Sequence, residues 1–275
     1  MTRPLRLRPG IAACLLLIGL AAPLSAHEFW IAPQSHRAEV GTKMTADLRV
    51  GQDMQGEVFP WLRRSVITAQ HWTPSGAVPL KGREGDIPAL SFAFDEPGLH
   101  RITFHAAPAY INFDNMEKFQ SYLTYEGLTG IVEAHRARGL PEEDFAEGYI
   151  RNARALVQVG PASADQLDTP TGMPFELVAV QNPFVDGTTA IDVALTWQGQ
   201  PSADTQVAIF VQAAGTAGAD NVTRTLVKTD AGGIARIPFA QPGTYLLAAV
   251  HMEPFNGTAV FWESHWATLT FDVRP

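Results

Sequence analysis

Short runs of alternating apolar and polar residues fill the chain from residue 27 to residue 112. Clear examples are "MTADLRV" (44–50), "RSVITAQHW" (64–72) and "GLHRITFHA" (98–106), and turn-forming stretches such as "TPSGA" and "DEPG" lie between them. A period of two is typical of a strand with one buried face, and evenly spaced short strands favour a β-sandwich. We therefore predict an N-terminal β-sandwich over residues 27–112.

The period changes between residues 113 and 160. In "FDNMEKFQSYLTYEGL" (113–128), Asp114 stands three residues before Glu117, as in a capping box, and apolar residues follow at helical spacing. In residues 141–160, a proline and three acids come first, as helix N-termini favour. The apolar stripe that follows them is made of Phe145, Tyr149, Ala153, Leu156 and Val157. We predict a helical segment over residues 113–160.

The strand pattern returns after a polar linker at residues 161–172. Seven apolar runs separated by turn residues occupy residues 173–275, which is the size of one sandwich. They are "FELVAV", "AIDVALTW", "TQVAIFVQ", "RTLVKTD", "GIARIPF", "TYLLAAVHM" and "AVFWESHWATLTFDV". The predicted fold class is mainly β, with two immunoglobulin- or transthyretin-like β-sandwich portions and a helical insertion between them.

The first 26 residues have the pattern of a secretory signal peptide. Three arginines in the first ten residues precede an apolar run at residues 11–22, and Ala26 is a small residue at the expected cut. Twelve apolar residues are fewer than the ~20 that span a bilayer. We expect cleavage after Ala26, a mature chain that begins at His27 without a transmembrane segment, and a periplasmic location.

Charge and cysteine content exclude several classes of function. The chain has 20 Lys and Arg against 28 Asp and Glu, and removing three leader arginines leaves 17 against 28, a net charge of −11. Without a basic stripe, nucleic-acid binding is excluded. The single cysteine, Cys14, lies in the leader, so the mature chain has neither a disulfide nor a cysteine nucleophile. It also lacks a G-x-S-x-G or G-x-G-x-x-G motif, so we expect a non-enzymatic protein.

Several blocks of sequence resemble the DUF4198 family of exported bacterial proteins. They are "HEFWIAP", "FQSYLTYEGL", "EGYIRNARALVQVG", "GMPFELVAVQNP", "TDAGGIARIPFAQPGTYLLAAVHM" and "WESHWATLTF", in this order along the chain. The resemblance implies export, a β-rich fold and an accessory role in periplasmic nickel or cobalt uptake. Its partner would be a membrane metal transporter or an outer-membrane receptor. His265 departs from the family pattern, which has Tyr or Leu there.

Three histidines are the candidate metal ligands. A mature N-terminal His27 offers an α-amine and an imidazole from one residue, a donor pair that also suits copper. His251 ends an apolar strand and is its natural partner, and His105, at another strand end, is a third candidate. A two-residue turn at Asn256-Gly257 would pair His251 with Trp262. His251 and His265 would then point to opposite faces.

Other interpretations stay open at this level. The histidine at position 265, beside Glu263, reads as a core pair, His71 as packing, and His36 and His135 as solvated. The protein could instead be a structural or interaction module that binds a protein or an envelope glycan through an aromatic face with Trp262 and Trp266. A third alternative is a copper oxidase that uses the terminal histidine as a brace.

Overall fold

The computed structural model describes residues 28–274 and shows a mainly β protein, as predicted. The expected leader (1–26) and His27 lie outside the described residues. The strands of residues 28–274 form three sheets. The first contains β1 (Glu28–Pro33), β3 (Lys43–Gln52), β4 (Gln55–Phe59) and β7 (Leu90–Ala93). The third contains β11 (Phe175–Ala179), β12 (Ala190–Trp197), β13 (Gln200–Pro201) and β16 (Ile234–Pro238).

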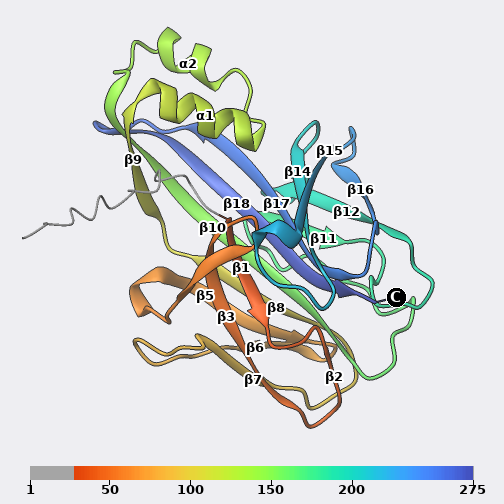
Figure 1. Cartoon of the computed structure of the whole chain (residues 1–275). Helices are drawn as coiled ribbons and strands as arrows, with labels where there is room; N and C mark the ends of the chain where they lie inside the picture. The colour runs from red at the N-terminus through yellow and green to blue at the C-terminus, as the bar shows by residue number, and fades with distance from the viewer. Residues whose placement is uncertain (1–27, 275) are drawn as a thin grey trace, which may run out of the picture.

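The second sheet is long and runs through both halves of the chain. Its main order is β15 (Val222–Lys228), β14 (Gln206–Ala213), β17 (Gly243–Pro254), β18 (Val260–Val273), β10 (Glu143–Val159), β8 (Gly98–Ala106), β5 (Val66–Thr73) and β6 (Gly76–Pro79). The strands β2 (Arg37–Ala38) and β9 (Ala109–Asn115) also pair with β10. The long strands β10, β17 and β18 run side by side through the middle of the molecule (Figure 1).

Two sandwich cores share this long sheet. One face packs against the third sheet through Leu156, Leu247 and Leu269, which meet Phe175 and Leu195. Further along, the other face packs against the first sheet, where Ala153, Ala155 and Val157 of β10 meet Ile31 and Leu48. The strand β10 therefore contributes side chains to both cores.

Residues 141–160 were predicted as a helix, and this prediction is wrong: Glu143–Val159 within them form the 17-residue strand β10. Phe145, Tyr149, Ala153 and Val157 are spaced by four, and a spacing of four fits one face of a strand as well as one stripe of a helix. The second half of β10 is also buried on both faces. Such a strand lacks the alternation that would have identified it.

The helical prediction holds within residues 113–128. The helix α1 (Met116–Glu126) begins at Asn115, whose side chain accepts a hydrogen bond from Lys118 N, and it ends at Gly127 in the left-handed conformation. A short helix α2 (Ile131–Ala137) follows, and both helices gather at one end of the long sheet (Figure 1). Within the described residues, no helix is long and apolar enough to cross a membrane.

Several side chains expected at the surface are buried. Trp262 and Trp266 are 1% and 2% exposed beneath the helices, so they offer no aromatic face to a glycan or a protein. His135 is enclosed, where Nδ1 accepts from Trp262 Nε1 and Nε2 donates to Pro141 O. His36 is also buried and donates through Nδ1 to Leu156 O at 2.7 Å. Both histidines were predicted to be solvated because their neighbours in the sequence are polar. The sequence does not show the backbone carbonyls and the indole to which the two rings are hydrogen-bonded.

The segment predicted as a linker, residues 161–172, contains neither helix nor strand, yet part of it is buried. Asp168 of this segment forms an ion pair with Arg154 of β10, and Arg154 also pairs with Glu176 of β11. All three side chains are almost fully buried, at 0–3% exposure. The segment is thus tied to both the long sheet and the third sheet.

Candidate metal centre

The hairpin of β17 and β18 has a different register from the one expected. His251 pairs with His265, not with Trp262, which is three residues away. The expected two-residue turn does not form, because Gly257 N donates to Val260 O and Phe255 N to Phe261 O in a longer loop. A shift by an odd number of residues moves a strand's side chains to the other face. His251 and His265 therefore lie on the same face, which corrects the prediction.

Three side chains of this hairpin converge near its turn, beside the loop that joins β17 to β18. Glu253 and Glu263 are paired directly across the two strands, and His265 is two residues from Glu263 on the same face. One donor atom from each of the three lies within 4.8 Å of the others. Carboxylate oxygens and a neutral imidazole nitrogen are ligands for divalent transition metals. We call Glu253, Glu263 and His265 the hairpin metal group.

The interactions inside the group leave it short of positive charge. His265 Nε2 donates to Glu263 Oε1 at 3.1 Å, and His251 Nε2 lies 4.0 Å from Glu253 Oε2. Among the described residues, neither carboxylate forms an ion pair with a lysine or an arginine. Like charges directly opposite on neighbouring strands are destabilising. A bound cation would remove this repulsion.

Trp197 at the end of β12 covers both histidines. Its ring centroid is 4.4 Å from that of His251, with the planes nearly stacked, and 4.4 Å from that of His265. His265 is 5% exposed, and its Nδ1 has no hydrogen-bond partner in the described part of the chain. The metal group thus has an apolar wall on one side, while Glu253 at its outer edge is partly exposed.

Burial keeps the imidazoles neutral near pH 7. It lowers the pKa of His265 to about 4, with Glu253 opposing the shift and His251 and His105 adding to it. Burial also lowers the pKa of His251, although Glu253 partly counteracts it. A neutral imidazole carries one lone-pair nitrogen, so these rings can act as ligands without first losing a proton.

Of the three predicted ligands, His251 and His105 lie within the described residues. His27 lies outside them, so its role stays a prediction. Its neighbour Glu28 starts β1, which lies over the face of β18 that carries Thr268 and Thr270, whose hydroxyls donate to β1 carbonyls. That face is opposite to the one with His251. His105, on β8, is separated from β18 by β10, although it is near enough to lower the pKa of His265.

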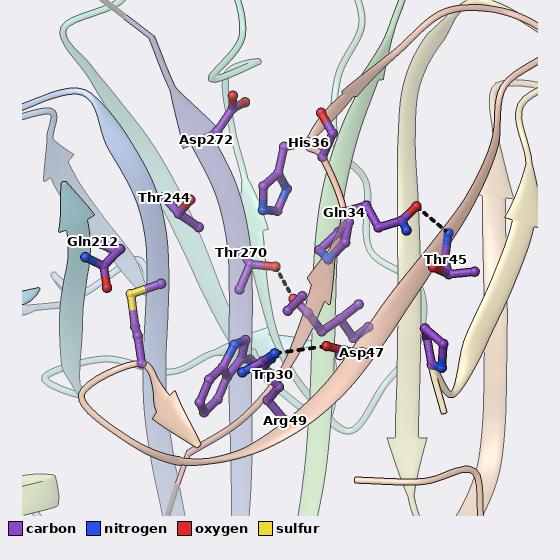
Figure 2. A pocket seen from close by; sticks show the side chains of 16 residues that line it. Trp30, Gln34, His36, Thr45, Asp47, Arg49, Gln212, Thr244, Thr270 and Asp272 are labelled. Carbon is purple, nitrogen blue, oxygen red and sulfur yellow. Dashed lines mark hydrogen bonds and ion pairs between the residues drawn. The ribbon is translucent and has the colours of Figure 1, made fainter. Parts of the chain in front are cut away.

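A separate cavity of about 630 Å³ lies between β1 and β3 on one side and β14, β17 and β18 on the other. Figure 2 shows its polar lining, with Arg49 donating to Asp47 at 3.0 Å. Asp272 pairs with Arg37 at 3.4 Å, and His36 is held by Leu156 O. These charged groups already neutralise one another, so we assign the cavity no ligand.

Comparison with known proteins agrees with the sequence blocks. A family model described as a domain of unknown function, DUF4198, matches residues 24–253. The chain belongs to the DUF4198 family. No curated protein matches it. Among solved structures, the FN1–FN3 domains of chicken CNTN1 are similar with a TM-score of 0.21 and 9% identity, over 91% of this chain and 69% of that chain. A likeness this low adds no argument about the DUF4198 protein.

Sequence reasoning missed the hairpin metal group in this DUF4198 chain for two reasons. Glu253, Glu263 and His265 were all visible, but the assumed turn placed Glu263 and His265 away from Glu253. His265 also departs from the family pattern, which argued against it. The signal that could have found the group is the spacing of these residues. Glu253 is two residues from His251, and Glu263 is two residues from His265, so on the two strands of one hairpin each glutamate shares a face with its histidine.

Proposed function

We propose that this DUF4198 protein is a non-enzymatic metal-binding accessory protein that holds one divalent transition-metal ion at the hairpin metal group. The observation that supports it is the convergence of Glu253, Glu263 and His265 donor atoms within 4.8 Å. Two ligands of one ion lie at most about 4.0–4.4 Å apart, given bonds of ~2.0–2.2 Å. A small rotation of the half-exposed Glu253 side chain would close the remaining gap.

The donor set bears on the choice of metal. Two carboxylates and one imidazole, with His251 close by, form a mixed oxygen and nitrogen site. Such a set suits nickel, cobalt or zinc, and it lacks the soft sulfur donors that select Cu(I). Nickel or cobalt agrees with the role implied by the family resemblance. A free His27 terminus, with its α-amine and imidazole, would instead suit copper.

The cellular part of the proposal rests on the leader and the family. A chain exported to the periplasm that holds a divalent ion could deliver it to a membrane metal transporter or accept it from an outer-membrane receptor. The partly exposed edge formed by Glu253 and His251 would be the route by which the ion enters and leaves. An ion that must be passed on is better held at such an edge than in a sealed core.

Titration of the metal-free mature chain with Ni²⁺, Co²⁺, Zn²⁺ and Cu²⁺ tests the proposal. We expect one ion per chain, and at least a tenfold loss of affinity in Glu263→Gln and Glu253→Gln. Glu142→Gln removes an equal charge from an exposed ion pair with Arg136 and is the matched control. Equal affinity in all three variants would refute the hairpin site.

The same titration separates the hairpin site from a terminal one. A Gly-Ser extension ahead of His27 blocks any site that uses the α-amine but leaves the hairpin untouched. Loss of binding in the extended chain, with the Glu263→Gln variant unaffected, would move the metal to His27.

A further inference from the structure

A cavity of about 360 Å³ opens between the last strand of the long sheet and an edge of the first sheet. Within residues 28–274, β6 pairs only with β5, and β7 pairs only with β3, so the space between β6 and β7 is not closed by a further strand. Val78, Leu80 and Phe92 form apolar walls of the cavity. Ligand pockets have volumes of about 300–1,000 Å³, so this one fits a small molecule.

Two buried histidines form a hydrogen-bonded chain behind this cavity. His71 and His100 are 3% and 0% exposed. His100 Nε2 donates to Glu96 O at 2.9 Å, because a carbonyl oxygen can only accept. In a neutral imidazole the second nitrogen is then an acceptor, and His100 Nδ1 accepts from His71 Nε2 at 2.8 Å. The bond to Glu96 O thus fixes the tautomers of both rings.

The chain of hydrogen bonds ends at Nδ1 of His71, which carries a lone pair. His71 lines the cavity, and its Nδ1 has no hydrogen-bond partner among residues 28–274. The rings of Phe92 and Phe94 pack against the imidazole, each with its centroid 5.4 Å away, so the orientation of the imidazole is fixed by its neighbours. The His71 ring therefore offers the cavity one oriented acceptor.

Burial makes this acceptor better suited to a neutral donor than to a cation. It is the main cause of the low pKa of His71, about 4; His100 lowers this pKa further and Glu96 raises it. A positive charge on the ring is thus disfavoured even with a carboxylate nearby. An ammonium group at Nδ1 would lose its hydration in the same way, whereas a neutral O–H group donates without that cost.

The charged side chains that line the cavity do not change this preference. Asp95 and Lys81 are exposed and opposite in sign. The carboxylate of Glu96 is already held by Ser75, which donates from its backbone N at 3.2 Å and from Oγ at 2.6 Å. What the cavity lacks is one hydrogen-bond donor and an apolar group against its walls.

We propose that this cavity binds a small neutral molecule of the phenol class, with the hydroxyl donating to His71 Nδ1 and the ring lying against Val78, Leu80 and Phe92. Val78 is 52% exposed in the empty cavity, so an apolar occupant would cover hydrophobic surface. None of the hairpin metal group lines this cavity, so the site is independent of the proposed metal function.

Fluorine NMR titration of the metal-free chain with 4-fluorophenol, 4-fluoroanisole and 4-fluorobenzylamine tests the proposal. The anisole has no O–H donor, and the benzylamine is a cation at pH 7. We expect 4-fluorophenol to bind at least ~fivefold more tightly than either of the others, and its advantage over 4-fluoroanisole to fall below ~twofold in His71→Leu. Glu57→Gln, exposed on β4 outside the cavity, is the control and should keep the wild-type preference.

Each other outcome overturns the proposal. Equal affinity for the phenol and the anisole, or no saturable binding of the phenol, means that Nδ1 keeps water as its partner. Tighter binding of 4-fluorobenzylamine means that the cavity takes a cation. An unchanged phenol preference in His71→Leu means that the phenol binds elsewhere.

If His71→Leu does not fold, nitrogen-15 NMR of the wild-type imidazoles decides. We expect Nδ1 of His71 to be unprotonated at pH 7 and its signal to move toward that of a protonated nitrogen when 4-fluorophenol is added. The signals of His36, whose Nδ1 donates to Leu156 O, should stay in place. A protonated His71 Nδ1, or a signal that does not move, refutes the proposal.

Discussion

His251 and His265 lie directly opposite each other on β17 and β18, with the Trp197 ring against both imidazoles. The next pair along the same face is Glu253 and Glu263, so two histidines and two glutamates form adjacent cross-strand pairs. The four side chains occupy one end of the hairpin, where the third sheet stops at Trp197. This arrangement leads to testable consequences for stability and for metal binding.

Glu253→Lys should make the metal-free protein more stable and should abolish metal binding. The substitution replaces a like-charge cross-strand pair by an opposite-charge pair, which is worth about 0.2–1 kcal/mol. We expect the Tm in EDTA to rise by ~1–4 °C. Differential scanning calorimetry with and without Ni²⁺ measures both effects. A lower Tm in EDTA would show that the two glutamates do not repel each other in the folded protein.

Trp197→Ala should raise the pKa of His265. Burial is the main cause of its low value of about 4, and the indole supplies part of that burial. Exposure to water should move the pKa toward the ordinary 6.5. NMR titration of the imidazole C–H signals measures the change, with Trp72→Ala as a control on another part of the sheet. An unchanged pKa would mean that other side chains keep water away from the ring.

His71→Gln should make stability less sensitive to acid. His71 donates through Nε2 to His100 Nδ1 at 2.8 Å, and burial together with His100 lowers its pKa to about 4. The folded-state pKa lies below the unfolded value, so the stability is present above pH ~6.5 and is lost as pH falls toward 4.

Urea unfolding of the wild type and of His71→Gln at pH 7, 5.5 and 4.5 checks this, because the difference between their unfolding free energies reports the contribution of His71. We expect the gap in unfolding free energy to shrink by about 2 kcal/mol over this range. A constant gap would contradict a neutral buried His71.

Arg154→Met should be strongly destabilising. The guanidinium is buried between Asp168 and Glu176, and its removal leaves both buried carboxylates without their ion-pair partner. Such a loss costs about 3–5 kcal/mol, measured by chemical unfolding. Arg236→Met breaks an exposed pair with Asp192 and should cost under ~1 kcal/mol. Similar losses in the two variants would contradict the burial of the Arg154 network.

Strand alternation allowed most of the fold to be predicted. The runs at 98–106 and 190–197 coincide with β8 and β12. β12 alternates between buried and half-buried residues, whereas β8 is buried along its first seven residues and keeps only the alternation of its sequence. β10 was missed because its residues face two cores and its large side chains are spaced by four. A single sequence does not show that two sandwiches meet on one strand.

The site was only partly predictable, for a similar reason. His251 was identified as a candidate, but its neighbours depend on the length of the loop after Pro254. Local turn propensity favoured Asn256-Gly257, whereas the backbone closes the loop at Val260. One odd shift was enough to separate Glu253 from Glu263 and His265 in the prediction.

The position of β10 has a consequence for how the molecule can be handled and how it can have arisen. Hydrophobic side chains of β10 pack into both sandwich cores. If the chain were divided before or after β10, the half without this strand would expose part of its core to water. We expect that neither half folds when it is expressed alone, and that the two halves unfold in a single thermal transition. If the two sandwiches arose by duplication of one independently folding sandwich, one copy must have lost a strand, because the two now share β10.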